Sequence, residues 1–584
     1  MRFFHLSTLF LLTTSLCAGS IRLLDDSPQA AFAQAEINGV AAGAAYDIVL
    51  RIDTALGFEA YRIGVAGTAV EVIGGDPNGL MYGGLRLADQ LRASKVAADS
   101  GTPYVKKRGL KFNIPLDGRT PSYDDTGDAA QQNIGTMWEW DYWTHFLDNM
   151  ARNRYNLLTL WSMHPYPSWV KVPEYPDVAL EDVYVYDEEI TPDIYRDWRG
   201  IDLKPQEKYR KIKTITMDEK IAFWRRVFRY AEDRGIDVYV FHWNIFVYGA
   251  EGKHGINGEQ TDDTTIDYFR QSVKQFLLTY PTIKGIGVTA GERIDKQLTG
   301  EYSIENWMWK TYGRGIMDAR AENPDIDVRF IFRRHWSDLN DIKKAFREYA
   351  GPFETSFKYA RARMYSSPDL PWFDKIYRPT IEATEIPCWF NVRNDDIFSL
   401  RWGSPDYARR FIENMPVHLS PGFYMGPDGY VWGKEFTSKD PALAGRYEVN
   451  KHWYRFRIWG HTAYDPQLPA DYWHEQLEIR YPGVNGRLLH DTYAATAEVV
   501  SWLNKVRYRQ NDAMFSFEAG QGDHKDPDYF HTVDDFIRYG AMPEQGVQTI
   551  ADYARAQGSG EGLTPFDVAG KLRSAAATLE TGAA

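Results

Sequence analysis

Residues 283–294, IKGIGVTAGERI, form a short apolar run that ends at Thr289, Ala290 and Gly291 and is followed at once by Glu292. A run of this kind, bounded by turn residues, is typical of a buried parallel strand. Packing gives no reason for a carboxylate directly after such a strand, whereas the C-terminal strand ends form the catalytic face of a (β/α)8 barrel. We therefore predict a barrel in which Glu292 is the leading acid–base candidate.

Strand-like and helix-like segments alternate on both sides of this stretch, from Arg108 to about residue 440. The other seven strand-like segments are KRGLKFNIPL, YNLLTLWSMHP, IDVYVFHWN, IDVRFIFRRHW, ETSFKYARARMYSS, PTIEATEIPCWFNVRNDD and HLSPGFYMGPDGYVWG. Repeated alternation implies right-handed crossovers and a parallel sheet, and eight units favour a closed barrel over a doubly wound sheet. The expected fold class is α/β: a (β/α)8 TIM barrel with a small N-terminal α/β domain and a helical C-terminal domain.

Four parts of the chain follow from this interpretation. They are a signal peptide at 1–19, an α/β accessory domain at 20–106, the catalytic barrel at 107–440 and the helical domain at 441–584. Arg2, a short apolar run and small residues before position 20 are typical of a secretory signal, which predicts a secreted or periplasmic protein. Removal of this signal leaves Cys388 as the single cysteine, so an exported protein would depend on its core rather than on a disulfide.

Composition excludes some partners and is compatible with others. The formal net charge of -13 argues against a nucleic-acid or anionic-membrane surface, and no later segment is long and apolar enough to span a bilayer. The 19 Trp and 37 Tyr residues could stack on sugar rings, although a large aromatic core accounts for most of them.

Basic residues gather near the ends of the fifth, sixth and seventh predicted strands of this acidic chain. They are Arg333, Arg334, His335, Lys358, Arg361, Arg363 and Arg393. Arginine forms bidentate pairs with carboxylate and sulfate groups, so a basic pocket predicts an anionic substrate such as a uronic acid or a sulfated sugar. The alternative is that every second strand residue points outward and pairs with carboxylates on the helices.

Hydrolysis of a glycosidic bond usually needs two carboxyl groups, an acid and either a base or a nucleophile. Glu292 is the best acid, and its alternative role is that of an N-terminal helix residue. Asp395 and Asp396 directly follow the seventh predicted strand and are preferred as the second carboxylate over Asp428 and Asp117. An Asn-Asp-Asp sequence is also an ordinary turn or helix cap.

The residues expected to bind substrate share a place near a predicted strand end. They are Trp161, His164, His242, Trp243, Arg333, His335, Lys358, Arg363, Tyr365, Arg393, Asn394 and Asp428. Three of these are histidines and could in principle form a zinc site, but no HExxH or paired HxH spacing supports one. We expect no metal and no other cofactor.

Two motifs resemble parts of known glycoside hydrolases. GLMYGGLRLADQL, residues 79–91, resembles the accessory domain that precedes the barrel in families 20, 67, 84 and 115. RFRIWGHTAYDPQLPADYWHEQLEIRYP, residues 455–482, is similar to the segment with which the family 67 α-glucuronidases begin their helical C-terminal domain. The resemblance implies exo-acting, inverting hydrolysis of a terminal α-linked glucuronic acid, with an acid on the fourth strand that Glu292 matches.

The chain departs from family 67 at the sixth and seventh strands. The family places its other carboxylates there in motifs like KNGPMDF and QITQEY, where this chain has FKYARARMYSS and IEATEIPCWFNVRNDD. Lys358 matches in position, but the family's Asp has no counterpart. The adjacent acidic pair of families 20 and 84 is also absent, because Gly291 precedes Glu292.

The function expected from these observations is release of a terminal uronic acid from an acidic plant or algal oligosaccharide by a secreted, α-glucuronidase-like, inverting exo-glycosidase. One alternative is a polysaccharide lyase that uses Tyr359, Tyr365 and His335 on uronates. A β-N-acetylhexosaminidase-like or other exo-glycosidase and a binding protein on a degenerate barrel also stay open. The expected partner is an anionic oligosaccharide, and the C-terminal helices could mediate a homodimer.

Overall fold

The computed structural model describes residues 19–40, 45–122, 128–187, 208–291, 293–358, 367–369, 373–392, 402–427, 430–436, 438, 440–443, 445–506, 522–523, 526–530, 532–538, 540–541, 546–558 and 561–583. The chain divides into two compact units, Met1–Thr102 and Pro103–Ala584.

The first unit is a mixed five-stranded sheet with two helices. Its strand order is β1-β2-β4-β3-β5, in which β1, β2 and β4 pair in parallel and β3 pairs antiparallel with β4 and β5. The elements are β1 Ile21–Leu23, α1 Pro28–Asn38, β2 Asp47–Ile52, η2 Thr54–Leu56, β3 Tyr61–Ala66, β4 Ala69–Gly74, α2 Pro77–Arg92 and β5 Asp99–Gly101.

Helix α2 explains the glycine-rich motif of this unit. The helix begins where the Asp76 carboxylate accepts the Gly79 N–H at 2.7 Å, with proline in the first turn. A Cβ on Gly84 would lie 2.5 Å from the Ala33 Cβ on α1, and one on Gly83 would lie 2.7 Å from the Val72 side chain on β4. Close packing against α1 and the sheet therefore accounts for glycines that would otherwise weaken a helix.

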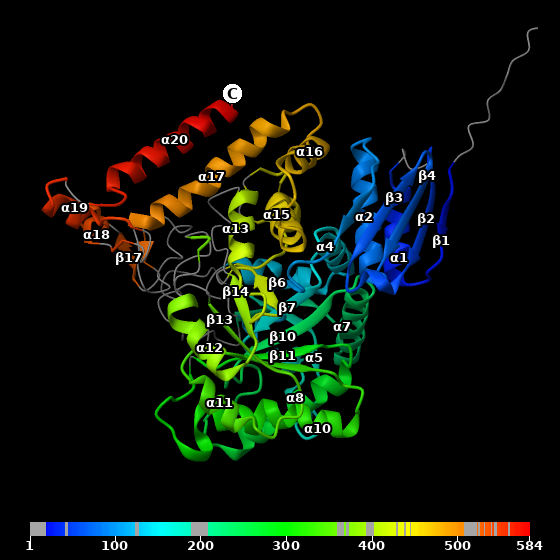
Figure 1. Cartoon of the computed structure of the whole chain (residues 1–584). Helices are drawn as coiled ribbons and strands as arrows, with labels where there is room; N and C mark the ends of the chain where they lie inside the picture. The colour runs from blue at the N-terminus through cyan, green and yellow to red at the C-terminus, as the bar shows by residue number, and fades with distance from the viewer. Residues whose placement is uncertain are drawn as a thin grey trace, which may run out of the picture. The chain divides into compact units, whose positions relative to one another are not determined.

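The second unit contains a closed barrel of eight parallel strands, which confirms the predicted fold class (Figure 1). The strands follow in the order β10-β11-β12-β13-β14-β15-β6-β7 around the barrel. Their bounds are β6 Lys107–Asn113, β7 Leu157–Ser162, β10 Asp237–Trp243, β11 Gly285–Thr289, β12 Arg329–Arg333, β13 Phe353–Lys358, β14 Cys388–Val392 and β15 Gly422–Met425.

Large aromatic side chains fill the interior of the barrel. Trp161 of β7 stacks on Phe241 of β10 with 4.1 Å between ring centroids. Tyr239 of β10 and Trp389 of β14 approach to 5.9 Å, although their strands lie on opposite sides of the closed sheet. Because ring contacts cross the barrel, its interior at the level of these residues is a packed core rather than a pore.

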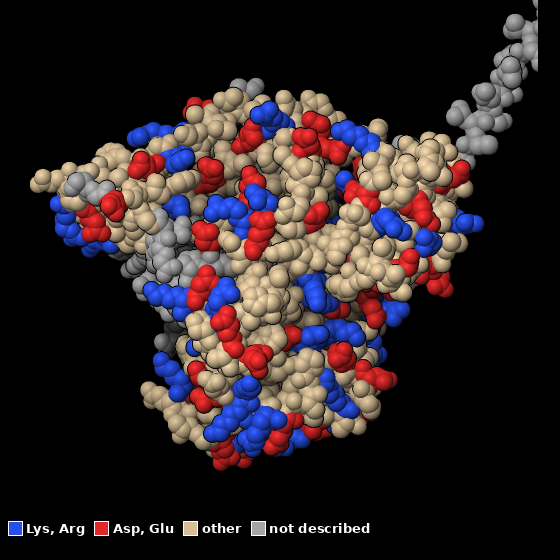
Figure 2. Space-filling view, in the orientation of Figure 1, with Lys and Arg blue, Asp and Glu red and all other residues tan. Residues whose placement is uncertain are grey.

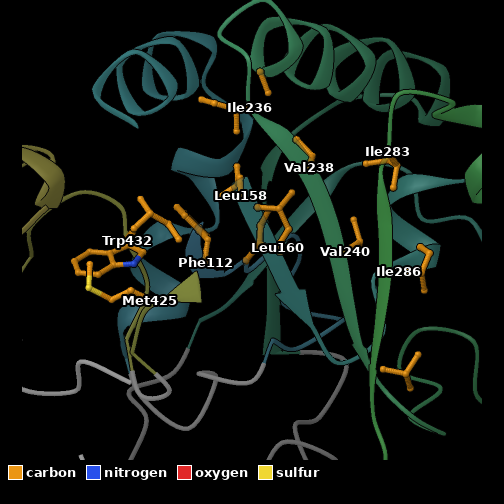
Figure 3. Close-up of a cluster of buried hydrophobic side chains, with 14 of the residues drawn as sticks. Phe112, Leu158, Leu160, Ile236, Val238, Val240, Ile283, Ile286, Met425 and Trp432 are labelled. Atoms are coloured by element: carbon orange, nitrogen blue, oxygen red, sulfur yellow. The ribbon is translucent and has the colours of Figure 1, made fainter. Parts of the chain in front are cut away.

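The outward faces of the same strands are equally apolar. Leu158, Leu160, Val238, Val240 and Ile286 are all buried between the strands and the surrounding helices (Figure 3). Both faces of a barrel strand are thus hydrophobic, as expected for a parallel sheet covered by helices.

Helices and helical turns alternate with the strands. They are α3 Asp128–Asn133, η3 Gly135–Trp138, α4 Trp140–Arg152, α5 Tyr166–Trp169, η4 Pro176–Val178, α7 Met217–Glu232, α8 Asp263–Thr279, η7 Gly300–Tyr302, α9 Ile304–Met308, η8 Trp309–Gly313, α10 Arg314–Glu322, α11 Leu339–Ala345, η10 Phe373–Tyr377, α12 Arg378–Thr384 and α13 Pro405–Asn414. Helix α7 begins with a capping box, in which Thr216 and Glu219 satisfy each other's backbone N–H groups.

The seventh strand is shorter than the sequence predicted. Residues Arg378–Thr384 form helix α12 with proline in its first turn, and the strand β14 begins at Cys388. Glu382 therefore lies on a helix, and Glu385 ends that helix in a left-handed conformation with φ 57°. The β-branched residues of PTIEAT favour a strand locally, but Pro379 is well suited to a helix start.

Further elements lie between β7 and α7 and after the barrel. The strands β8 Val183–Tyr186 and β9 Tyr209–Lys213 pair antiparallel between β7 and α7. The C-terminal elements are α14 Glu448–Lys451, α15 Trp453–Tyr464, α16 Ala470–Arg480, α17 Gly486–Val506, β16 Gly522–Asp523, β17 Asp526–Phe530, α18 Val533–Arg538, α19 Ile550–Arg555 and α20 Pro565–Ala583. Within the described residues, none of the helices has the length and apolarity needed to cross a bilayer.

Candidate functional site

Inward-facing side chains meet at the C-terminal end of the barrel. Trp243 on β10 is the register partner of Thr289 on β11, and Thr289 is the partner of Arg333 on β12. Paired residues of neighbouring strands point to the same side of a sheet. Since Trp161 and Phe241 fill the barrel interior, Trp243, Thr289 and Arg333 face inward one layer above them.

Arg333 is the central charged group of this layer. It is 6% exposed, and its Cζ atom lies 5.7 Å from the ring centroids of both Trp161 and Trp243. Its Nη1 donates to the Thr289 hydroxyl at 3.3 Å, while its Nε has no hydrogen-bond partner in the described part of the chain. Among the described residues, no carboxylate lies within ion-pair distance of this guanidinium. On the surface shown in Figure 2, by contrast, acidic and basic side chains are interspersed. A buried cation without a counter-ion is costly unless a ligand supplies the anion.

Asn391 on β14 is a second polar group of the inward face. It is fully buried, and neither its Oδ1 nor its Nδ2 has a hydrogen-bond partner among the described residues. Its register partner is Lys358, the last residue of β13, whose side chain lies outside the described residues. Asn391 is not among the residues predicted from the sequence, although its alternation with Trp389 in CWFN predicts that the two share one face of the strand.

Two side chains of β6 hold the loop that follows β15. Lys111 Nζ donates to the Pro427 carbonyl oxygen at 2.8 Å and lies 5.1 Å from the Trp161 ring centroid. Asn113 Nδ2 donates to the same carbonyl at 3.0 Å. Pro427 directly precedes Asp428, which itself lies outside the described residues. Lys111 and Asn113 therefore position the end of the eighth strand, a role that the sequence analysis did not assign.

The segments after β11 and β12 are joined at their backbones. Ala290 N–H donates to the Arg333 carbonyl at 3.4 Å, and Trp336 N–H donates to the Ala290 carbonyl at 3.2 Å. His335 packs directly on this junction, because a Cβ on Gly291 would lie 2.3 Å from its Nδ1. Glu292 lies outside the described residues, but the residues before and after it are described.

Arg293, the residue after Glu292, has an uncommon backbone conformation. Its φ is +64°, in the left-handed region that non-glycine residues rarely adopt, and its Cζ lies 5.1 Å from the Phe246 ring. Strain of this kind concentrates at functional sites because surrounding structure must hold it in place. Seven other described non-glycine residues also have a positive φ, so this conformation by itself does not mark the strand end as functional.

His164 and His242 occupy a different place from the one expected. Both lie on the helix-facing side of the barrel wall, fully buried, where His164 Nε2 accepts from the Tyr268 hydroxyl at 3.0 Å and Nδ1 donates to the Tyr248 carbonyl at 2.6 Å. The His242 ring stacks on Tyr166 at 4.7 Å. The barrel strands separate both histidines from the inward-facing residues, so neither contributes to a site inside the barrel mouth.

These two histidines predict a loss of stability in acid. Burial lowers the pKa of His164 to about 4 and that of His242 to about 3, whereas both titrate near 6.5 when unfolded. Below pH 6.5 the unfolded chain therefore binds more protons than the folded chain. Each of these two histidines lowers the free energy of unfolding by about 2 kcal/mol by pH 5. The His242→Leu variant is expected to show a smaller drop in Tm between pH 7 and pH 5 than wild type. An equal drop would mean that His242 does not contribute to acid sensitivity.

Several other predicted residues lie outside the described residues. They are Arg363, Tyr365, Arg393, Asn394, Asp395 and Asp396. Asp117, an alternative second carboxylate, is fully buried, and both its oxygens accept from the Arg119 guanidinium at 2.8 Å. That bidentate pair gives Asp117 a structural role. Within the described residues no cluster of His, Cys, Asp or Glu could hold a metal ion.

A pocket elsewhere in the described structure lies between α8 and the α9–α10 segment, where Arg270, Lys310 and Arg314 are among its lining residues. Arg270 pairs with Asp318 there, and Lys310 pairs with Glu301. Cations that already have carboxylate partners are less available to an anionic ligand than Arg333 is. We therefore place the candidate site at the strand ends.

Comparisons with known proteins support the fold. The chain is similar to the solved structure of a GH138 enzyme targeting the pectin rhamnogalacturonan II, with a TM-score of 0.74, 20% sequence identity and coverage of 96% of this chain. The match spans 65% of the length of that structure. It shares the barrel and the flanking regions, so it establishes the fold of this chain rather than its substrate.

More distant structures are family 20 enzymes. One is an exo β-N-acetylglucosaminidase from Vibrio harveyi in complex with N-acetylglucosamine, with a TM-score of 0.49, 8% identity and coverage of 81% of this chain and 75% of that one. Another is the Streptomyces plicatus N-acetyl-β-hexosaminidase, with a TM-score of 0.47, 13% identity and coverage of 82% and 92%. No family model and no curated protein matches the sequence. The resemblance to family 67 stays a prediction.

Proposed function

We propose that this chain is an exo-acting glycoside hydrolase, exported by its N-terminal signal, that releases a terminal uronic acid from an acidic oligosaccharide. One observation carries the proposal: Arg333 is buried at the inward end of β12, lies 5.7 Å from the ring centroids of both Trp161 and Trp243, and has no carboxylate partner among the described residues. A guanidinium in this environment suits the planar carboxylate of a uronic acid. The two indoles are themselves buried and hold the guanidinium in place.

The proposed chemistry assigns one proton transfer to each carboxyl group. Glu292 protonates the glycosidic oxygen as its bond to the anomeric carbon breaks. Asp395 or Asp396 removes a proton from water while the water oxygen forms the new bond to that carbon. Inversion requires a separation of ~6.5–9.5 Å between the two carboxyl groups, whereas ~5–5.5 Å would lead to retention. The products are the free uronic acid and the shortened chain.

The carboxylate of the released sugar would be held by cations from β12 to β14. Arg333 is a candidate whose side chain the structure describes, and Lys358, Arg363 and Arg393 are further candidates from the sequence. The α-linkage and the inverting course rest on the resemblance to family 67 alone.

The test is incubation with a panel of oligosaccharides, in which each substrate ends in a uronic acid, a neutral sugar, a sulfated sugar or N-acetylglucosamine. Pectin oligosaccharides belong in the panel because the GH138 fold neighbour targets pectin. Proton NMR should detect release of a uronic acid and the anomer formed first. A product with new ultraviolet absorbance would instead support a lyase, and release of N-acetylglucosamine would support the hexosaminidase alternative. Absence of any turnover would favour a binding protein.

Asn391 provides an independent prediction. A buried amide without partners costs about 1–3 kcal/mol, so the Asn391→Leu variant should be more stable than wild type. If the amide binds a hydroxyl of the sugar, the same variant should lose about tenfold or more in kcat/KM. Thermal melting and steady-state kinetics on the panel's best substrate measure the two effects. Unchanged stability would indicate that a trapped water already satisfies the amide.

A further inference from the structure

Trp336 and His335 form an exposed aromatic platform against Gly291, the residue that precedes the predicted acid in the sequence. Trp336 is 42% exposed and follows β12 by three residues. Its backbone N–H donates to the Ala290 carbonyl oxygen at 3.2 Å, and its ring stacks on His335 with 5.3 Å between centroids and 21° between planes. His335 in turn abuts Gly291. The indole is therefore held in a defined orientation against the segment that leads into position 292, rather than being a freely rotating surface side chain.

A cation accompanies this ring. Lys296 Nζ lies 5.6 Å from the Trp336 ring centroid, and the lysine is exposed. The backbone beside it is held in place, since Asp295 N–H donates to Gln260 Oε1 at 2.7 Å and Gln260 Nε2 donates to the Tyr302 carbonyl at 2.7 Å. Among the described residues no carboxylate lies within ion-pair distance of Lys296. The ammonium group is thus available to an anion that stands against the ring.

Trp336 and Lys296 are more exposed to solvent than Arg333 is. Arg333 is 6% exposed in the barrel mouth, whereas Trp336 is 42% exposed only three residues later in the chain. Glu292 directly follows Gly291, on which His335 packs. A glycosidic bond at the predicted acid would place its released sugar on the deep side and its leaving-group sugar on the exposed side.

We propose that Trp336, His335 and Lys296 form an outer subsite that binds an acidic sugar residue on the leaving-group side of the scissile bond. The aromatic face packs against the C–H groups of that sugar, and Lys296 pairs with its carboxylate. This inference rests on the proposed hydrolase function. It makes the enzyme selective for a substrate with two successive acidic residues, because each subsite carries its own cation.

The test compares substrates that differ only in the leaving group. The first is a uronic acid linked to a second acidic sugar, the second is the same uronic acid linked to a neutral sugar, and the third is the uronosyl fluoride. The Trp336→Ala variant should raise KM about tenfold on both sugar-linked substrates and leave the fluoride unchanged, because fluoride has no ring to stack. The Lys296→Met variant should raise KM only for the substrate with the acidic leaving group, and should reduce the salt dependence of that KM to the level seen with the neutral leaving group. Phe566→Ala and Lys344→Met, on exposed positions of α20 and α11, are matched controls.

Each result decides between the two proposals. If Trp336→Ala impaired the reaction equally on all three substrates, Trp336 would support the reaction centre and the subsite proposal would be overturned. An unchanged KM on all three substrates would overturn it as well. Equal effects of Lys296→Met on acidic and neutral leaving groups would remove the acidic assignment. If wild type cleaves none of the substrates, the proposed function fails; calorimetry with the uncleaved acidic disaccharide then tests the platform alone. Equal affinity of wild type and Trp336→Ala in that experiment would overturn it too.

Discussion

The Glu292→Gln variant is expected to lose about a thousandfold or more in kcat on oligosaccharide substrates, with little change in KM. Glutamine keeps the size of the side chain but cannot protonate the leaving oxygen, and general acid catalysis contributes about 10²–10⁴-fold. The reaction on a uronosyl fluoride should fall far less, because fluoride leaves without a proton. The pH–rate profile should also lose its basic limb, which reports the acid. Steady-state kinetics on the two substrates at several pH values measures all three effects.

Glu301→Gln is the matched control for this variant. Glu301 carries an exposed carboxylate that pairs with Lys310 at 2.8 Å on the same connection between β11 and α9. Its replacement should leave kcat unchanged and lower stability only slightly, since surface ion pairs contribute ~0–1 kcal/mol. Undiminished turnover by Glu292→Gln, or an equal loss on the fluoride, would remove Glu292 from the role of acid.

The Arg333→Met variant should lower kcat/KM on a uronic acid substrate by about 30- to 1,000-fold. Removal of one partner from a buried charge pair costs about 2–4 kcal/mol, and each 1.4 kcal/mol is about tenfold in rate. The methyl ester of the same substrate has no charge to bind, so its kcat/KM should change little. The variant should also melt at a higher temperature than wild type, because a buried guanidinium without a counter-ion is removed.

Arg334→Met controls for the loss of a neighbouring arginine. Arg334 points to the opposite side of β12, where its Cζ lies 5.7 Å from the Tyr377 ring. Its replacement should leave the preference for the acid over the methyl ester intact. Equal losses on acid and ester in Arg333→Met would mean that Arg333 maintains the barrel mouth and does not bind the carboxylate. A lower Tm in Arg333→Met would support the same conclusion.

Arg333 and Arg334 also illustrate the limit of the sequence. Both stand in the basic run at the end of the fifth strand, and the sequence predicted an anion site without separating their faces. Register with Thr289 and Ser356 turns Arg333 inward, and the next residue then faces the helices. His164 and His242 lie at or just after strand ends, as predicted, but their side chains face the helices rather than the barrel interior.

The physical reason is that barrel strands are buried on both faces. In an open antiparallel strand, polar and apolar residues alternate and mark the side that faces solvent. In β10 the inward Phe241 and the outward Val240 are both fully buried and apolar. Local hydrophobicity therefore locates the strand but carries no information on which of its faces lines the site.

Local chemistry was enough to place seven of the eight strands near their observed positions, because each strand is an apolar run with its own start and stop signals. The order of those runs along the chain then implied a closed parallel sheet. Strand register and residues distant in sequence decide the direction of each side chain and the burial of Arg333. They also decide the burial of the Asn391 amide and the contact between Trp336 and the Gly291 segment. These features arise only when eight separate strands pair, so they can be determined from the tertiary structure but not from any one segment of the sequence.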